Sequence, residues 1–316
     1  MLVLCSFFLP GCTSMGSYVM SNPDVYLSET ELIKVKPSEI GFKKHTFCSA
    51  SSLQCITYLA ASAYQAADFP TGSAPYYNLH ATGNGVENTI SHRMPPTTFN
   101  RFKGTALLLH GYGGSKEVMM ATAIYFRALG MDVVIPDLFG HGESTEAFAF
   151  AAKEHTILNE LLTQLSLKQT DKRTIAVGHS MGALTATNLL SSKYINAAIL
   201  LAPMMSFELA AREYLPYKSP LLNKLFQNQL GDIVNQTMIN AKVTIQETDL
   251  LYKLKGTEKP VLLINSNIDT LSPPAYFSSI QNEQVEKVLF KNRSHSSLMV
   301  FGSNDISEVE HWLLKL

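Results

Sequence analysis

The sequence predicts an α/β fold in which a mostly parallel sheet is covered by helices on both faces. From residue 104 onward, short apolar segments of strand length alternate with segments of helical periodicity, and such alternation is typical of parallel sheets. The predicted strands are continuous apolar runs, which indicates that both of their faces are buried. Residues 204–258 interrupt the alternation with several short helical patterns. We interpret them as an insertion into the fold.

The composition is that of a folded protein with a large apolar core. Apolar residues make up 46% of the 316 residues and charged residues 16%, which excludes a highly charged disordered chain. The 25 Lys and Arg residues are balanced by 26 Asp and Glu residues, so no basic excess is available to bind nucleic-acid phosphates. No apolar run reaches the roughly 18 residues of a transmembrane helix.

The N-terminus has the pattern of an export signal. Leu2 to Leu9 is an almost wholly apolar run of signal-peptide length. The Leu9-Pro10-Gly11-Cys12 sequence resembles the bacterial lipobox, which implies a signal over residues 1–12 and a lipid on Cys12. No Lys or Arg precedes Lys34, so an ordinary secretory signal and a buried apolar start are alternatives. We expect a lipid-anchored protein of the bacterial cell envelope, or a cytoplasmic protein if the start is not a signal.

The cysteines permit one disulfide and give no support for a metal site. Cys48 and Cys55 flank a short turn between two strand-like segments, so they can pair across a hairpin if the chain is exported. Two free buried thiols are the alternative. The sequence contains no C-x-x-C and no H-E-x-x-H motif. We therefore expect neither a metal nor any other cofactor.

Residues 13–103 are expected to form an arm and the leading strands of the fold. Residues 14–37 are polar and mixed, which is typical of a tether. Residues 43–59 and 76–93 are predicted hairpins, the second around an Asn-Gly dipeptide that favours tight turns. Residues 53–67 are rich in alanine and are also compatible with a helix.

The regular part of the chain divides into two core segments, residues 104–203 and 259–316, on either side of the insertion. Its predicted strands are Thr105–Leu109, Asp132–Pro136, Thr174–Val177, Ala197–Leu201, Val261–Asn265 and Lys287–Phe290. Its predicted helices are Lys116–Leu129, Glu146–Leu167, Ala183–Ser192, Pro273–Gln281 and Ile306–Leu316. Gly130 is placed to end the first of these helices.

A candidate nucleophile lies between a predicted strand and a predicted helix. Gly178-His179-Ser180-Met181-Gly182 fits the pattern G-x-S-x-G. The strand before it and the helix after it provide the strand–turn–helix that a nucleophile elbow requires. The two glycines permit the tight turn, which holds the Ser180 hydroxyl out at the carboxyl edge of the sheet. We therefore predict Ser180 as the nucleophile.

A serine hydroxyl needs a base and a carboxylate that orients the base. Of the nine histidines, His295 has the best placement, between the last predicted strand and the last predicted helix. Asp269 follows another strand and completes the chain order Ser, Asp, His that accompanies this elbow. Asp137 is the rival for the acid, although its D-x-x-G-H-G setting suggests a structural turn.

The tetrahedral intermediate of such a reaction needs backbone N–H donors for its oxyanion. We predict the N–H of Met181, which follows the nucleophile, and the N–H of Tyr112. Tyr112 lies in the glycine-rich segment His110–Gly114, just after the first predicted parallel strand. This segment is not a phosphate-binding loop, because Gly114 is followed by Ser115-Lys116 where a Walker A motif needs Lys and then Ser or Thr.

Five features together are similar to the α/β-hydrolase superfamily. They are His110–Gly114, Asp137–Ser144, Gly178–Gly182, Asp269 and His295. The resemblance is greatest to the branch of monoacylglycerol lipases, lysophospholipases and serine aminopeptidases. It covers residues 104–316 and implies an α/β-hydrolase fold with residues 204–258 as a helical lid. It does not specify the substrate.

These residues favour a serine hydrolase that cleaves carboxylic esters through an acyl-enzyme on Ser180. The alternatives are an aminopeptidase or thioesterase on the same triad and, less favoured, a non-catalytic binding protein. An aminopeptidase should hold the substrate amine with an acidic group, for which the insertion offers Glu208, Glu213, Asp232, Glu247 and Asp249. The insertion is rich in apolar side chains, so we expect a small ester with an apolar acyl chain. We expect His110, Gly111, Met204 and Phe207 to contact it.

Overall fold

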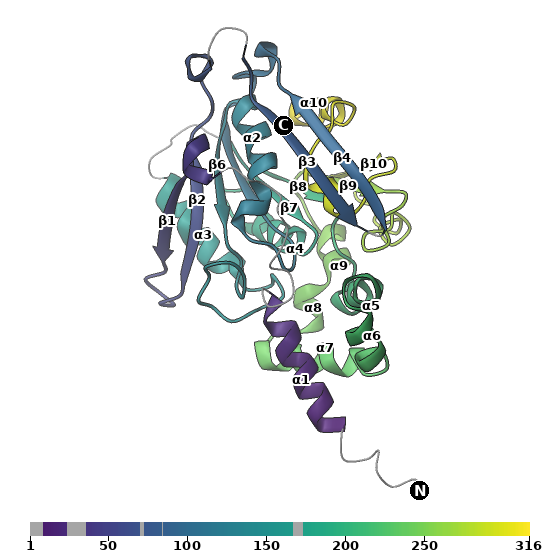
Figure 1. Ribbon diagram of the computed structural model, residues 1–316. Helices are drawn as coiled ribbons and strands as arrows, with labels where there is room; N and C mark the ends of the chain where they lie inside the picture. The colour runs from purple at the N-terminus through teal and green to yellow at the C-terminus, as the bar shows by residue number, and fades with distance from the viewer. Residues whose placement is uncertain (1–8, 24–35, 70–72, 84, 167–172) are drawn as a thin grey trace, which may run out of the picture.

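The computed structural model describes residues 9–23, 36–69, 73–83, 85–166 and 173–316 around a central eight-stranded sheet (Figure 1). The strand order is β1-β2-β6-β5-β7-β8-β9-β10. These strands are β1 (Lys43–Cys48), β2 (Cys55–Ala61), β5 (Gly104–Leu109), β6 (Met131–Pro136), β7 (Arg173–His179), β8 (Ala197–Leu201), β9 (Val261–Ser266) and β10 (Val285–Phe290). From β6 to β10 all neighbours are parallel, whereas β1 and β2 pair antiparallel. The prediction of a mostly parallel sheet is confirmed.

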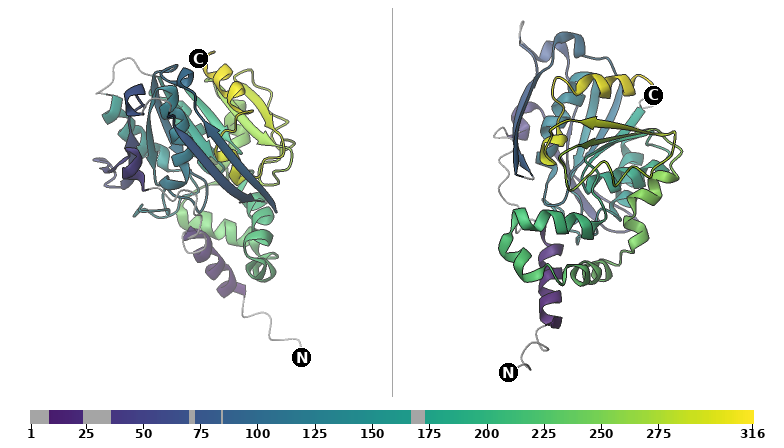
Figure 2. Two further views of the ribbon diagram at one scale, coloured as in Figure 1. Left: turned by 45° about the horizontal axis from the view of Figure 1, so that its top comes forward. Right: turned by 90° about the vertical axis from the view of Figure 1, so that its right-hand side faces the viewer.

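Helices cover both faces of the sheet, because alternate side chains of its strands enter two separate cores. On the fully buried strand β5, Leu107 and Leu109 belong to one core, and Ala106 and Leu108 to the other. The first core includes side chains of two helices, α3 (Glu154–Ser166) and α4 (Gly182–Asn188). The second includes those of α2 (Met120–Leu129) and α10 (Ile306–Leu313). The two layers are visible in Figure 2.

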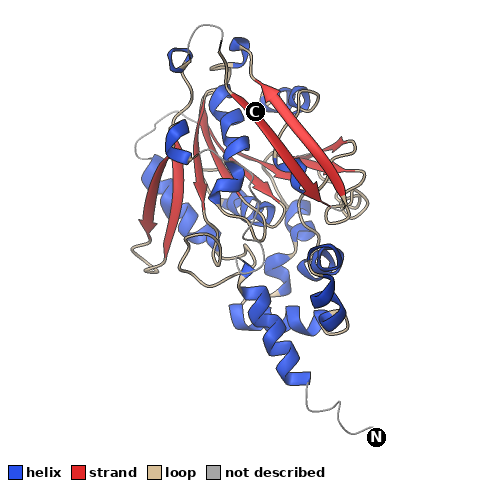
Figure 3. Cartoon of the chain, viewed as in Figure 1, coloured by secondary structure: helices blue, strands red, loops and turns tan. Residues whose placement is uncertain are grey.

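Two hairpins precede the parallel strands, as predicted. β1 and β2 form the first, which excludes the alternative helix over residues 53–67, and Cys48 and Cys55 face each other in its register and form a disulfide. β3 (Tyr76–Gly83) and β4 (Val86–Arg93) form the second (Figure 3). Alternate residues of β3 are buried, and they join the core on the α2 side of the sheet.

Five helices between β8 and β9 make up a separate helical segment. They are α5 (Phe207–Lys218), α6 (Pro220–Phe226), α7 (Leu230–Ala241), α8 (Ile245–Thr248) and α9 (Leu250–Lys255). A further helix, α1 (Leu9–Ser21), packs against α7. The expectation of a tether over residues 14–37 is therefore wrong at its start, because Ser17 and Met20 are buried in this contact. Residues 1–8 and 24–35 lie outside the described part of the chain.

The predicted helix from Glu146 begins only at Glu154. Between these positions Phe148, Ala149 and Phe150 are buried, and Phe150 and Ala151 have positive φ angles of 56° and 59°. Left-handed residues cannot continue a right-handed helix. The aromatic side chains instead hold this loop against the core, which favours an irregular backbone over a helix.

The predicted helix over Pro273–Gln281 is also wrong. The backbone forms successive four-residue turns there, with hydrogen bonds from the Tyr276 N–H to the Pro273 carbonyl at 3.0 Å and from the Phe277 N–H to the Pro274 carbonyl at 3.2 Å. The segment wraps around the Phe277 side chain, which is fully buried. The segment therefore packs on the core through the Phe277 ring, whereas a helix would pack through an amphipathic face.

Candidate active site

Ser180 lies at a sharp turn between β7 and α4. Its backbone has a φ of 52°, in a left-handed region that costs energy for a residue with a Cβ atom. The flanking glycines are required by close packing. A Cβ on Gly178 would lie 2.4 Å from the Gly182 carbonyl oxygen, and one on Gly182 would lie 2.4 Å from the Leu109 carbonyl oxygen. The strained turn and its glycines are those of a nucleophile elbow.

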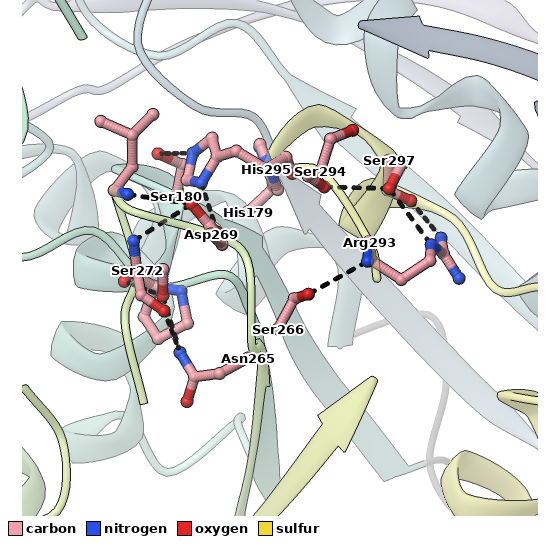
Figure 4. Close-up of polar contacts among 12 residues, drawn as sticks. His179, Ser180, Asn265, Ser266, Asp269, Ser272, Arg293, Ser294, His295 and Ser297 are labelled. Carbon is pink, nitrogen blue, oxygen red and sulfur yellow. Dashed lines mark hydrogen bonds and ion pairs between the residues drawn. The ribbon is translucent and has the colours of Figure 1, made fainter. Parts of the chain in front are cut away.

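His295 joins Ser180 to Asp269 in a chain of hydrogen bonds (Figure 4). The Ser180 Oγ lies 2.8 Å from the Nε2 of His295, and the Nδ1 of His295 lies 2.8 Å from the Oδ2 of Asp269. Ser180 follows β7, Asp269 follows β9 and His295 follows β10, so each side chain comes from the end of a different strand. Residues that the sequence separates by more than a hundred positions thus meet at one edge of the sheet.

The electrostatics of Asp269 suit a carboxylate that orients a histidine. Burial raises the pKa of the Asp269 carboxyl, but the charge of His295, its hydrogen bond and the Leu271 N–H lower it more, so the pKa lies below its usual range. The other oxygen accepts from the N–H groups of Leu271 at 2.9 Å and Ser272 at 3.3 Å. The ionised carboxylate accepts a hydrogen bond from the Nδ1–H of His295, which leaves Nε2 free of a proton and able to accept the proton of Ser180.

His179 supports the backbone of His295, a role that the sequence did not indicate. Its Nε2 lies 3.0 Å from the carbonyl oxygen of His295, and burial lowers the pKa of His179 to about 3. The neutral ring therefore donates this hydrogen bond and fixes the backbone that carries His295. The one signal for this role in the sequence was the position of His179 directly before Ser180. A strand residue at that position points into the protein.

Asp137, the rival acid, is part of a different network. Its Oδ2 lies 2.6 Å from the Nζ of Lys116 and 2.9 Å from the N–H of Glu143, and its Oδ1 accepts from the Lys116 N–H at 2.8 Å. Both side chains of the ion pair are buried. Asp137 thus holds together two loops beside the site, whereas Asp269 contacts His295.

The loop after β5 passes directly beside the nucleophile. A Cβ on Gly111 would lie 3.0 Å from the Cβ of Ser180, so only glycine lets the backbone come this close. Tyr112 follows in this loop, and its ring packs edge-on against Phe207. Met181 lies at the start of α4, where backbone N–H groups have no partner within the helix. The two candidate oxyanion donors therefore come from segments that flank Ser180.

His110 does not have the substrate-contacting position that we expected. Its ring is fully buried, its Nε2 accepts from the Leu138 N–H at 3.0 Å, and its Nδ1 lies 2.8 Å from the Gly111 carbonyl oxygen. Burial lowers the pKa of His110 to about 4, so the ring is neutral. With both nitrogens engaged, His110 supports the loop and has none left for a substrate.

A cavity with mainly apolar walls opens beside Ser180. It is lined by Phe150, Ser180, Met181, Leu184, Met204, Met205, Phe207, Thr248 and Leu250. Met204 and Phe207 were expected here from the sequence. Phe150, Leu184 and Leu250 were missed, because Phe150 was assigned to a helix and the other two lie on helices whose orientation the sequence does not show. The Phe-Ala-Phe pattern at 148–150 was the available signal.

Comparisons with known proteins agree with this architecture. A family model described as serine aminopeptidase, S33, matches residues 100–255. An esterase of Pyrococcus furiosus has a similar structure, with a TM-score of 0.62 and 19% identity over 94% of this chain and 98% of that chain. An α/β serine hydrolase of Xanthomonas campestris, described as lacking a lid, has a TM-score of 0.53 and 14% identity over 90% and 97% of the two chains. The chain has the fold of the α/β-hydrolases.

The α/β-hydrolase also has curated relatives over a short stretch. It is 36% identical to mouse protein ABHD8 over 81 residues. The same identity and length are found with human protein ABHD8. The match spans 26% of this chain and 18% of the length of either relative, so it supports the superfamily and does not extend to the activity of the whole relative.

The acidic residues of the helical segment in this α/β-hydrolase are engaged or exposed. Glu208 pairs with Arg212 at 2.7 Å, Glu247 pairs with Lys153, and Asp249 accepts the Tyr252 N–H at 3.0 Å. Glu213 and Asp232 are exposed. Within the described ranges, no carboxylate lines the cavity beside Ser180.

The described residues lack two kinds of feature. No group of three or more His, Cys, Asp and Glu side chains among them is placed to hold a metal ion. None of the helices that the structure describes combines the length and apolarity needed to cross a bilayer.

Proposed function

We propose that this α/β-hydrolase cleaves carboxylic esters through an acyl-enzyme on Ser180. The observation that carries the proposal is the hydrogen-bonded chain from Ser180 through His295 to Asp269, next to an apolar cavity. A strained, nearly buried serine with an imidazole nitrogen at 2.8 Å has the arrangement that activates a hydroxyl for attack.

In this mechanism, His295 first takes the proton of the Ser180 hydroxyl as Oγ attacks the ester carbonyl carbon. The carbonyl oxygen becomes an oxyanion, which the N–H groups of Met181 and Tyr112 stabilise. His295 then gives the proton to the leaving alcohol oxygen as the carbon–oxygen bond breaks. A water molecule, deprotonated by the same nitrogen, releases the carboxylic acid and restores Ser180.

The walls of the cavity favour an apolar acyl chain as substrate. Aromatic, leucine and methionine side chains form all of the wall apart from Ser180 and Thr248. Each methylene buried against such walls contributes about 0.8 kcal/mol. The cavity itself measures about 10 Å³, so in this proposal the helical segment moves outward to admit a longer chain. Four further carbons would therefore contribute about 3 kcal/mol, a preference of about two orders of magnitude over a short ester. The helical segment acts as a lid in this proposal, since Phe207, Thr248 and Leu250 belong to it.

An aminopeptidase is the second candidate, because the matching family model carries that description. Such an enzyme needs an acidic group close to the nucleophile to hold the substrate amine, and the described wall of the cavity contains none. Thioesters would use the same triad and the same apolar wall. The cavity therefore favours esters and thioesters over aminoacyl amides.

A fluorophosphonate probe tests the nucleophile directly. Wild type should be labelled and Ser180→Ala should not, whereas labelling of both would place the reactive group elsewhere. A panel of p-nitrophenyl esters from acetate to decanoate, with a thioester and an aminoacyl amide, then tests the substrate. Rates that peak at acetate, or that are highest for the aminoacyl amide, would contradict the apolar-ester proposal.

We also propose that Cys12 carries a lipid anchor and that the protein resides in the cell envelope. The support is the apolar run followed by Leu9-Pro10-Gly11-Cys12. Stable anchoring needs more than one acyl chain, which a diacylated and N-acylated cysteine provides. Fractionation of wild type and Cys12→Ser after an alkaline carbonate wash, which removes proteins held only by surface contacts, is the test. The variant should leave the washed membranes, and a soluble wild type that keeps its initiator methionine would refute the anchor.

A further inference from the structure

Exposed apolar side chains are concentrated on α1 and on the helical segment. Of the large apolar side chains that the structure shows as exposed, most belong to α1 and to the helical segment: Met15, Tyr18, Leu209, Leu221, Leu225, Ile239, Ile245 and Tyr252. Only Leu53, Tyr76, Leu289 and Leu314 lie elsewhere among the described residues. Scattered single apolar residues are ordinary on a protein surface, whereas a concentration of them marks an interaction site.

Helix α1 packs closely against α7 of the helical segment. The Oγ of Ser17 lies 3.0 Å from the Oγ1 of Thr237 and 3.1 Å from the Nδ2 of Asn240, both on α7. The backbone at Gly16 is so close to α7 that a Cβ atom there would lie 2.5 Å from the side chain of Ile233. These contacts fix the exposed Met15 and Tyr18 relative to the exposed residues of α6 and α7.

We define the apolar end as α1, α6 and α7, which lie together at the end of the molecule away from the C-terminus (Figure 1). Figure 2 shows the same arrangement from a second side. Its exposed apolar residues are Met15, Tyr18, Leu221, Leu225 and Ile239. α1 projects past the other two helices, with its N-terminal end outermost.

We propose that the apolar end docks on the surface of a lipid bilayer, through its own side chains and independently of any lipid on Cys12. Two observations select a bilayer over a protein partner. α1 contains no charged residue, so no hydrated charge on this helix opposes its entry into the headgroup region. The exposed side chains of this uncharged helix that the structure describes include the large apolar Met15 and Tyr18. An apolar helical face with Tyr and Leu side chains is suited to the boundary between headgroups and acyl chains.

Docking in this way would bring the candidate active site to its substrate. Phe207 and Leu250 of the helical segment line the cavity beside Ser180, and the same segment contributes α6 and α7 to the apolar end. An apolar ester dissolved in a bilayer would then reach the cavity without crossing water. The docking itself needs no turnover, so Ser180→Ala should bind vesicles like wild type.

Vesicle flotation of the full chain measures the docking. All proteins carry Cys12→Ser, which removes the lipid attachment site, and the vesicles consist of phosphatidylcholine, which has no net charge. The double variant Tyr18→Glu/Ile239→Glu should bind at least about tenfold more weakly, because two apolar contacts are replaced by charges. The control Leu53→Glu/Leu314→Glu changes two exposed apolar residues outside the apolar end and should bind unchanged. Hydrolysis of a soluble short ester should be the same in all of them.

A tryptophan reporter gives a second measurement that leaves the fold undisturbed. The sole natural tryptophan, Trp312, is buried, so added exposed tryptophans dominate any change on adding vesicles. Tyr18→Trp should shift its emission to shorter wavelength with phosphatidylcholine vesicles, and Leu53→Trp should not. An equal loss of vesicle binding in the two double glutamate variants would overturn the proposal, and so would an unshifted emission of Tyr18→Trp. So would a dimer in solution that Tyr18→Glu/Ile239→Glu dissociates without any effect on vesicle binding.

Discussion

The hydroxyl of Tyr112 donates a hydrogen bond to the backbone carbonyl oxygen of Met20 at 2.9 Å. Tyr112 lies in the loop beside Ser180, and Met20 lies near the end of α1. At about 1.5 Å per helical residue, Met20 is about 12 Å along the helix from Cys12. The first helix of the described chain thus contacts both the helical segment and the loop that carries a candidate oxyanion donor.

Removing the Tyr112 hydroxyl should loosen this contact and leave the chemistry in place. Tyr112→Phe keeps the ring against Phe207 and the backbone N–H, so we expect a loss of about 1 kcal/mol in the free energy of unfolding and less than about a tenfold change in kcat/KM. Tyr112→Ala also removes the ring and should lower both quantities further. Denaturant unfolding and ester kinetics on the two variants check this. A collapse of kcat in Tyr112→Phe would show that the phenol itself takes part in the reaction.

Substitutions of the two aspartates should separate catalysis from stability. Asp269→Asn should lower kcat by about 10³ to 10⁴ with the fold intact, because the neutral amide no longer fixes the histidine tautomer. Asp137→Asn removes the buried partner of Lys116, which keeps only the half-exposed Glu143 and Glu117, and should cost up to about 3 kcal/mol in stability. The measurements are kcat and the midpoint of thermal unfolding. If folded Asp137→Asn were less active than Asp269→Asn, the assignment of the acid would be reversed.

Glu154 should make stability depend on pH. Burial raises the pKa of this carboxyl from 4.5 to about 7, and its Oε1 has no hydrogen-bond partner. The folded state therefore holds a proton that the unfolded state releases between pH 4.5 and 7, so stability is highest below this window and falls as pH rises through it. The fall is about 3 kcal/mol.

The matched variant for this prediction is Glu154→Gln, which has nearly the same shape and does not titrate. Its free energy of unfolding, measured by denaturant at half-unit steps, should stay flat between pH 4.5 and 7 relative to wild type. An unchanged slope in the variant would assign the pH dependence to another group.

The disulfide should stabilise the first hairpin measurably. Cys48 and Cys55 close a short loop between β1 and β2, and cross-linking a loop of this length contributes about 2 kcal/mol in the chain-entropy account. Cys48→Ser/Cys55→Ser should therefore unfold at a lower temperature than wild type, and a reductant should remove the difference. Cys12→Ser serves as the control, with no change expected in either condition.

The sequence was sufficient to predict that Ser180, Asp269 and His295 meet, because its signals are local. A glycine pattern at Ser180 and the positions of Asp269 and His295 after strands indicate one sheet edge without any knowledge of packing. The loop around Phe150 was mispredicted, since its conformation depends on a core that the neighbouring residues do not reveal. The place of α1 was missed for the same reason, because its partner α7 lies far along the chain.

The partner of α1 is α7, which lies far along the chain, and this determines how late in synthesis α1 can pack. Ser17 contacts Thr237, 220 positions later, and domains fold in step with a ribosome that adds residues from the N-terminus. Three-quarters of the chain must therefore be made before α1 has a surface to bury against. Until then all of α1 stays accessible to any enzyme that cuts or modifies nascent chains, whereas the completed fold buries its face with Ser17 and Met20.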